Sequence, residues 1–386
     1  MPAFSPPYQQ YNGVWTLSQA SDAVAQSKWP SPPAPHLYAW GYNNNGQLGI
    51  NTILNSSSPN QVGSLTNWQS LASGGNFTTA IKTDGTLWAW GFNAQGQLGQ
   101  GNITNYSSPK QIGPLTNWSQ VGNGYYCTLA VKNDGTLWSW GANGQGQLGL
   151  GNTTYYSSPK QVGALTNWKF VAGGNACSAA IKTDGTLWTW GYNANGELGL
   201  NNRTYYSSPK QVGALTTWST VVLGRSSTIA LKTDGTLWAW GGNGTGTLGL
   251  GNTTYYSSPK QVGALTNWLK ISCGRYQATS IKTDGTLWVW GGNGFGQLGD
   301  GTTANKSSPK QLGSLTNWLQ VVASFYHTTS IKTDGTLWSW GYNNYGQLGL
   351  GNTTSYSSPK QVGSLTSWTT LSVGETSNST VAIAKT

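Results

Sequence analysis

The sequence predicts an all-β protein, a β-propeller in which seven four-stranded antiparallel blades close a ring. Three observations support this prediction. A tryptophan recurs every 50 residues from Trp40 to Trp340 without an insertion. Each unit consists of short apolar runs separated by turn residues, and a repeat of this length and composition is typical of propellers and solenoids. The chain also begins and ends in the middle of a unit, which favours a closed ring over an open array.

Six units carry an Asp-Gly pair between two apolar runs, first at Asp84-Gly85. This pair predicts a tight hairpin with a type I′ turn, because glycine adopts a positive φ at no steric cost. Before the hairpin, Ala80 and Ile81 are apolar side by side, so we expect both faces of that strand to be covered. Within one unit we expect four strands, over residues 109–115, 118–121, 128–132 and 136–141, which together form one blade.

The two ends of the repeat region complement each other. The first unit starts at Leu37 without the strand that precedes the hairpin, and the last unit stops after residues 381–386, which supply that strand. We therefore expect Tyr38 and Lys385 on paired strands of one shared blade. Both ends of the ring would then lie on the face of the Asp-Gly hairpins. No polar cap is visible, although an open array would need one.

One motif of the unit resembles a known family. Trp-Gly-x-Asn-x-x-Gly-Gln-Leu-Gly, at residues 140–149, follows Gly-x-x-x-(Ser/Thr)-x-Ala-(Ile/Leu/Val)-x-x-Asp-Gly. This combination is similar to the regulator-of-chromosome-condensation repeats, and the resemblance covers about nine tenths of the chain. It implies a seven-bladed propeller. It implies no single activity, since that family includes a guanine-nucleotide exchanger, a plant ultraviolet-B photoreceptor and a bacterial β-lactamase inhibitor.

The tryptophans are numerous and regular. The chain has 22 of them, about three per unit, and Trp68, Trp88 and Trp90 recur at the same places in the following units. We expect these side chains to pack between blades, and the alternative is a stacking site for ligands.

The residue types that metal binding and nucleophilic catalysis need are scarce in this sequence. The only histidines are His36 and His327, so His-based metal clusters and repeated Ser-His or Cys-His arrangements are excluded. Of the three cysteines, Cys127 and Cys177 share one position in adjacent units and form either a bridge or two buried thiols. No acid/base pair or nucleophile stands out from the repeat. We therefore predict a protein that is not an enzyme and uses no cofactor and no metal.

Glycine spacing could suggest a nucleotide site. Gly144-x-Gly146-x-x-Gly149 fits the dinucleotide fingerprint. That fingerprint needs a following helix whose N-terminus holds the pyrophosphate, whereas a Thr/Ser/Pro-rich loop follows here. We interpret the motif as a loop former.

The net charge of +10 is spread around the ring. Twelve of the twenty basic residues form two columns, one from Lys82 to Lys332 and one from Lys110 to Lys360. Nucleic-acid binding needs a concentrated stripe or patch, so we predict no nucleic-acid partner. No stretch is long enough to cross a bilayer and no secretory signal is visible, so no membrane insertion is expected.

Residues 1–36 form a separate leader and residues 37–386 form the propeller. The leader is Pro-rich at both ends, and Leu17, Ala20 and Val24 at helical spacing predict a short helix that Pro30 stops. Such a helix is marginal alone, so it packs either on its own propeller or on another protein. The segment resembles short leaders on structural proteins of marine tailed phages. The predicted anchor residues are Val14, Trp15, Leu17, Ala20, Val24 and Trp29.

The differences between units concentrate in two loops of each blade. In an antiparallel meander, the triplet after the first strand and the loop after the third strand lie at one end, opposite the hairpins. Aromatic residues mixed with Asn and Arg suit contact with sugars or with an adaptable protein surface, and the alternative is unconstrained loop tips. The predicted binding face comprises Tyr42, Phe77, Phe92, Tyr125, Tyr126, Asn175, Tyr192, Arg225, Arg275, Tyr276, Phe295, Phe325, Tyr326, His327 and Tyr345.

Three classes of function remain. The first, which we favour, is a virion structural or decoration protein of a phage, with the leader bound to other virion proteins and the propeller displayed outward at the particle surface for protein or host-glycan contact. The second is a soluble lectin-like or protein-inhibitor module, cytoplasmic or secreted without a recognisable signal. The third, an enzyme or nucleotide exchanger, lacks candidate residues.

Overall fold

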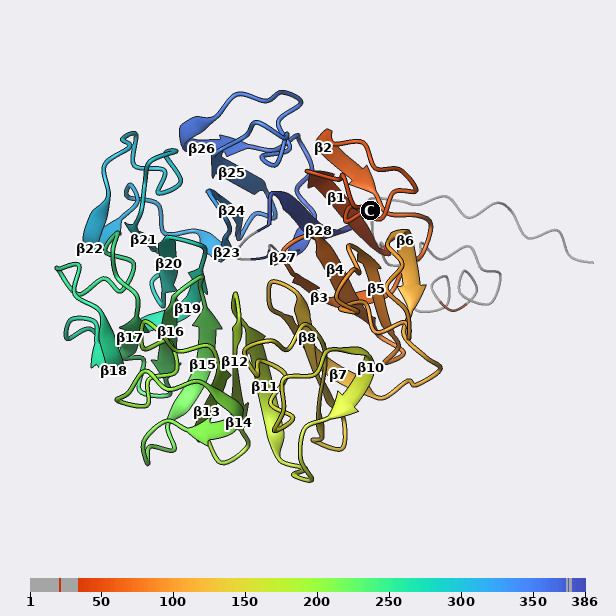
Figure 1. Cartoon of the computed structure of the whole chain (residues 1–386). Helices are drawn as coiled ribbons and strands as arrows, with labels where there is room; N and C mark the ends of the chain where they lie inside the picture. The colour runs from red at the N-terminus through yellow and green to blue at the C-terminus, as the bar shows by residue number, and fades with distance from the viewer. Residues whose placement is uncertain (1–20, 22–33, 373, 375–376) are drawn as a thin grey trace, which may run out of the picture. The chain divides into compact units, whose positions relative to one another are not determined.

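The computed structural model describes residue 21 and residues 34–372, 374 and 377–386. Residues 35–385 form seven four-stranded antiparallel sheets arranged around a ring (Figure 1). The all-β propeller predicted from the repeat is thus confirmed. The helix and the anchor residues predicted in the leader lie outside the described residues.

Within each blade the strands run in order from the ring centre outward. The innermost strands are β3 (Trp68–Ser73), β7 (Trp118–Asn123), β11 (Trp168–Gly173), β15 (Trp218–Leu223), β19 (Trp268–Cys273), β23 (Trp318–Ala323) and β27 (Trp368–Ser372). The second strands are β4 (Phe77–Lys82), β8 (Cys127–Lys132), β12 (Cys177–Lys182), β16 (Ser227–Lys232), β20 (Gln277–Lys282), β24 (His327–Lys332) and β28 (Ser379–Lys385). The third strands are β5 (Leu87–Gly91), β9 (Leu137–Gly141), β13 (Leu187–Gly191), β17 (Leu237–Gly241), β21 (Leu287–Gly291), β25 (Leu337–Gly341) and β1 (Pro35–Gly41). The outer strands are β6 (Tyr106–Gln111), β10 (Tyr156–Gln161), β14 (Tyr206–Gln211), β18 (Tyr256–Gln261), β22 (Lys306–Gln311), β26 (Tyr356–Gln361) and β2 (Ser56–Gln61).

The closing blade combines both ends of the repeat region. Its strand order is β2-β1-β28-β27, and β1 pairs antiparallel with β28, with Pro35 opposite Lys385 and Tyr38 opposite Ala382. The predicted closure is confirmed. Pro35 and Lys385 occupy the place that an Asp-Gly hairpin holds in the other blades, so the ring starts and ends on the hairpin face.

The predicted grouping of strands into blades was wrong in one respect. Residues 109–115 were expected to share a blade with residues 118–121. In the structure β6 ends at Gln111 and pairs with β5 of the preceding blade, with Ala89 opposite Lys110. Gly113, at φ +59°, interrupts the extended chain, and the following residues cross to the next blade.

The Asp-Gly hairpin forms, but its turn is not type I′. Only Gly85 has a positive φ, +76°, and its N–H donates to the carbonyl of Lys82 while the N–H of Lys82 donates to Thr86. This is a type I turn with a glycine bulge, the usual three-residue hairpin loop. The Asp84 carboxylate explains the preference, because Oδ1 accepts from both the N–H and the Oγ1 of Thr86, at 2.9 and 2.6 Å.

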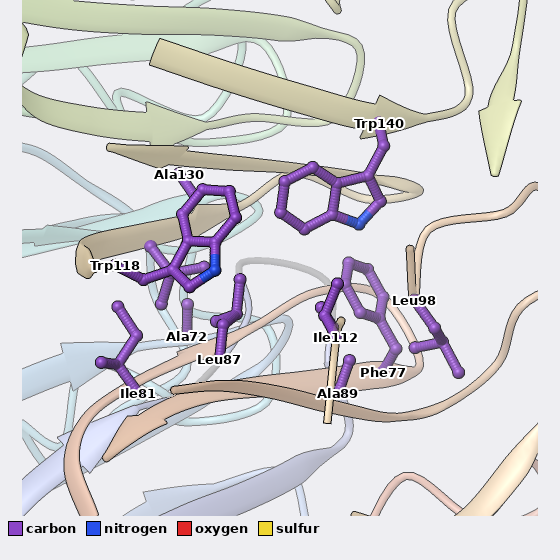
Figure 2. Packing of buried hydrophobic residues seen from close by; sticks show 11 residues of the cluster. Ala72, Phe77, Ile81, Leu87, Ala89, Leu98, Ile112, Trp118, Ala130 and Trp140 are labelled. Atoms are coloured by element: carbon purple, nitrogen blue, oxygen red, sulfur yellow. The ribbon is translucent and has the colours of Figure 1, made fainter. Parts of the chain in front are cut away.

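Adjacent blades are joined by buried tryptophans. Trp90 is fully buried, and its Nε1 donates to the carbonyl of Gln47 in the preceding blade at 3.0 Å; Thr78 Oγ1 donates to the same carbonyl. Figure 2 shows the next interface, where Trp118 and Trp140 lie against apolar side chains of the neighbouring blade. The prediction that the recurring tryptophans form the core is confirmed for the columns of Trp68 and Trp90, whereas the Trp88 column is only partly buried.

The asparagine and glycines of the repeat motif shape the long loop after the third strand. Asn93 is fully buried; its Oδ1 accepts from the N–H of Leu98, and its Nδ2 donates to the carbonyls of Asn102 and Thr104. The N–H of Gly101 then donates to the carbonyl of Ser157, in the outer strand of the next blade, at 2.8 Å. The loop therefore covers part of an otherwise open strand edge.

Candidate binding face

The two variable loops of each blade meet at one end of the propeller. The backbone N–H of Phe92, in the loop after the third strand, donates to the carbonyl of Asn76, in the triplet after the first strand. Ala142 and Tyr342 make the same bond to Tyr126 and Tyr326, each at 2.9 Å. The loops at this end are thus held together by the backbone. We call this end the variable face and the opposite end the hairpin face.

On one half of the variable face, arginines and aromatic rings of neighbouring blades form a chain of contacts. Arg225 donates from its guanidinium to Tyr276 Oη at 2.5 Å. The Arg275 guanidinium lies 5.1 Å from the ring centre of Tyr276 and 4.3 Å from that of Phe325. Tyr276 in turn stacks on Tyr326, with ring centres 6.0 Å apart. These distances suit cation–π and stacking contacts.

The chain continues across the next two blades. Phe295 lies 4.5 Å from Tyr326 and 5.0 Å from Tyr342, between ring centres. Tyr342 contacts Tyr345 at 6.2 Å, and Tyr345 contacts Tyr42 of the closing blade at 5.0 Å. The arginine–aromatic arc is therefore continuous from Arg225 to Tyr42. We use this name for its members Arg225, Arg275, Tyr276, Phe295, Phe325, Tyr326, Tyr342, Tyr345 and Tyr42.

The other half of the face carries two smaller aromatic groups. Tyr126 packs on Tyr125 at 4.1 Å and on Phe92 at 5.7 Å. Burial, together with the contact to Tyr125, raises the pKa of Tyr126 to about 12. Tyr192 packs on Tyr205 at 4.8 Å. These rings hold each other in place without joining the arc.

The arc carries positive charge that no ion pair compensates within the described residues. Within the described residues, the ion pairs are those of Lys306 and Lys310 with Asp300, on an outer strand and the loop before it. Arg225 and Arg275 form none. A guanidinium that stacks on aromatic rings and lacks a carboxylate partner is a suitable contact for acidic groups of another molecule.

Two residues predicted for the binding face are wrong, because their side chains are buried. Phe77 is 1 % exposed and His327 is 0 % exposed. Each begins a second strand, where the side chain turns inward between blades instead of outward. His327 Nε2 lies 3.0 Å from Thr380 Oγ1, and burial lowers the pKa of its imidazole to about 3. Asn175 and the other predicted residues are at least partly exposed.

The prediction also missed residues of the face. Tyr205 is 43 % exposed and packs on Tyr192, and Tyr342 links two parts of the arc. Tyr342 shares its sequence position with Tyr42 and Tyr192, which was a usable signal. Tyr205 follows the polar turn at the end of the long loop, and no pattern set it apart from its repeats.

The lysines of the first column lie over tryptophan rings of their own blade. Lys132 Nζ lies 3.8 Å from the ring centre of Trp138 and 5.0 Å from that of Trp118, and the other units repeat the arrangement. Five lysines of the second column lie over tyrosines, as Lys110 does over Tyr106, and the sixth, Lys310, pairs with Asp300. The positive charge is therefore distributed around the ring, as predicted.

Side chains that could bind a metal or act as nucleophiles are few in the part of the chain that the structure describes. No group of three or more His, Cys, Asp or Glu side chains in it could hold a metal ion. Cys127, Cys177 and Cys273 are all buried. No helix within the described residues has the length and apolar character to span a membrane.

Comparison with known families agrees with the geometry. Residues 34–278 match the model of the RCC1-like domain, and residues 284–331 and 334–382 match the regulator of chromosome condensation (RCC1) repeat. The chain belongs to the RCC1-like propeller family. A second RCC1 repeat model matches residues 268–297 and 318–347. A sequence comparison with curated proteins found no match.

Solved RCC1-like propellers share the fold at low identity. Human WBSCR16 is 22 % identical with a TM-score of 0.83, over 92 % of this chain and 99 % of that one. Prp20p from Saccharomyces cerevisiae is 20 % identical with a TM-score of 0.82, over 92 % of each chain. Yeast RCC1 (Prp20) bound to Kap60 is 18 % identical with a TM-score of 0.81, over 100 % of this chain and 95 % of that one. At this identity the likeness concerns the fold alone.

Proposed function

We propose that this RCC1-like propeller is a non-enzymatic binding protein that recognises a partner through its variable face. The observation that carries the proposal is the arginine–aromatic arc, which runs without a break from Arg225 to Tyr42. Tyrosine and arginine are enriched among the residues that dominate binding energy at protein interfaces. Rings held by their neighbours lose little conformational entropy on binding.

A protein partner is favoured over a glycan. The arc extends across several blades as a surface, whereas a sugar site needs a compact pocket with several converging polar groups. Its two arginines favour a partner that presents acidic side chains. The named properties of relatives point the same way, since Prp20p was characterised for binding to Gsp1p and histones, and yeast RCC1 was solved bound to Kap60.

Recognition of a partner can be tested with a triple variant. Tyr126→Ala, Arg275→Ala and Tyr326→Ala together remove partly exposed side chains from both halves of the variable face. The control variant replaces three loop leucines on the hairpin face, Leu165, Leu215 and Leu265, each 47 % exposed. Both variants should keep the wild-type melting temperature, and the first alone should lose attachment to cells or particles. Equal attachment by both variants would contradict the proposal.

We also propose a place for the protein, at the surface of a phage virion. The leader's resemblance to marine tailed-phage leaders supports this, and so does the polarity of the propeller. The ring begins at Pro35, paired with Lys385 on the hairpin face, so a tether there leaves the variable face outward. Removing residues 1–30 should abolish incorporation into particles and leave the propeller folded. If the truncated protein still assembles, the soluble binding module becomes the better proposal.

A further inference from the structure

We infer that the grooves between neighbouring blades, on the hairpin face, bind small apolar molecules that carry a carboxylate. Four such grooves have volumes of 350 to 440 Å³, within the range of small-molecule sites. Most of their lining residues recur at the 50-residue interval of the chain. A lysine lines two of the grooves, and in the other two Lys232 and Lys282 lie 3.6 Å from the ring centres of the lining residues Trp238 and Trp288. The sites are separate from the variable face, so this inference does not depend on the proposed function.

The groove between the second and third units of the ring shows the apolar part of the site. Ile112, Leu115, Trp138 and Pro159 line it. Leu115 is 44 % exposed although it is apolar, and the equivalent leucines of the other units are exposed to a similar degree. An apolar chain or ring placed in the groove would cover these side chains and gain about 25 cal/mol for each Å² of apolar surface removed from water.

A cation lies in the same groove. Lys132 lines it, with Nζ 3.8 Å from the ring centre of Trp138. Burial lowers the pKa of this lysine, while the charge of Asp134 opposes the shift. Within the described residues Lys132 forms no ion pair. An ammonium that lies over aromatic rings and forms no ion pair favours an anionic group on the ligand.

A second donor in the groove lacks an acceptor. Trp118 is 3 % exposed, and its Nε1 has no hydrogen-bond partner in the structure. The equivalent Trp68 donates to the carbonyl of Leu65 at 2.9 Å, which shows that this N–H faces the loop that holds the exposed leucine. Trp218, Trp268 and Trp318 line the other three grooves with the same unpaired N–H. Since buried donors are normally paired, this N–H favours an acceptor close by, and the Lys132 ammonium lies 5.0 Å from the centre of the same indole ring system.

One groove differs in a way that provides an internal comparison. Asp300 lines the groove of Trp318, at the position held by glutamine or leucine in the other three. Its carboxylate is held by Lys306 and Lys310 at 3.5 and 3.4 Å. A resident carboxylate repels a second one, so this groove should bind the anionic ligand most weakly.

The probes are octanoate and its uncharged analogue octanol, titrated into the full-length protein. Binding is followed by calorimetry and by the indole N–H resonances of ¹⁵N-labelled protein. Octanoate should shift the resonances of the unpaired indoles and leave that of Trp68 unchanged, and octanol should bind about tenfold more weakly or worse. Equal binding of octanol would overturn the inference.

Two sets of variants that lose the same number of positive charges distinguish binding by the groove lysines from an effect of the net charge of the protein. In the first set the six lysines over tryptophans become Gln: Lys82, Lys132, Lys182, Lys232, Lys282 and Lys332. In the second set the six outer-strand lysines become Gln: Lys110, Lys160, Lys210, Lys260, Lys310 and Lys360. The first set should weaken octanoate binding at least about tenfold, and the second should leave it nearly unchanged. Equal effects of the two sets would overturn the inference.

If the first set fails to fold, the exposed loop leucines provide a second test. Leu115, Leu215, Leu265 and Leu315, one from each groove, become Asp in one variant and the isosteric, uncharged Asn in another. The exposed positions tolerate both changes, so folding is retained. The Asp variant should lose octanoate binding beyond the loss in the Asn variant. Identical loss in both would exclude a carboxylate site.

Discussion

The buried histidine of the penultimate blade should make stability depend on pH, and His327→Gln should remove that dependence. The imidazole is 0 % exposed and its pKa is lowered to about 3 by burial. In the unfolded chain the same group titrates near its ordinary value of about 6.5. Between about pH 3 and about pH 6.5, the imidazole is therefore protonated in the unfolded state and neutral in the folded state. Above about pH 6.5 the histidine is neutral in both states and does not lower the free energy of unfolding. As the pH falls from there towards 3, the free energy of unfolding decreases.

The magnitude follows from the two pKa values. Each pH unit between them costs roughly 1.4 kcal/mol, so the folded state loses about 3 kcal/mol by pH 4 and about 4–5 kcal/mol by pH 3 through this group. Glutamine is a suitable replacement, because Gln277 occupies the equivalent buried position of the preceding blade and its Nε2 donates to the Ser324 carbonyl at 2.8 Å.

The assay is urea unfolding followed by tryptophan fluorescence between pH 7 and pH 4. Carboxylates such as Asp84, whose pKa is lowered by the hydrogen bond from the Thr86 side chain, also lose stability in acid, but they do so equally in both proteins. The difference between wild type and His327→Gln therefore isolates the histidine. Parallel stability curves for the two proteins would refute the reasoning.

Three further predictions concern the fold. Trp190→Ala should lower the free energy of unfolding by ~3–5 kcal/mol, as for other buried aromatic residues, and Trp188→Ala, at a half-buried position, should lower it less. A loss below ~1 kcal/mol for Trp190→Ala in urea unfolding would place this residue outside the core. Deleting residues 379–386 removes β28 and should lower the melting temperature sharply, so an unchanged calorimetric melting temperature would contradict closure of the ring. Gly85→Ala places a Cβ 2.1 Å from the Thr116 carbonyl oxygen and should destabilise more than Gly113→Ala, where φ is +59° but no atom lies within 4 Å; equal losses would show that the close contact is relieved.

Much of the fold could be predicted because the repeat determines it. The 50-residue period and the complementary ends at Leu37 and Lys385 were sufficient for the number of blades and the closure. The period does not show where one blade ends and the next begins. The outer strand Tyr106–Gln111 is short and polar, without apolar alternation, so its true partner β5 was not evident.

The hairpin and the binding face show where prediction from the sequence fails for single residues. The Asp-Gly pair predicted a hairpin, but the Thr86 hydrogen bonds to Asp84 select a different turn. The loop triplets predicted the variable face, yet the third position of six of the seven already belongs to a strand, which buries Phe77 and His327. Continuity of the arc depends on contacts between blades, such as Tyr42 with Tyr345, that only the closed ring creates.

The most direct test of the account is site-specific photocrosslinking from the two faces of the propeller. A benzophenone side chain replaces Tyr326 in the centre of the arc, or Leu165 on the hairpin face, in protein on intact cells or particles. The account predicts a discrete crosslinked partner from position 326 and none of the same mass from position 165. A partner captured only from position 165, or equally from both, would contradict recognition through the variable face.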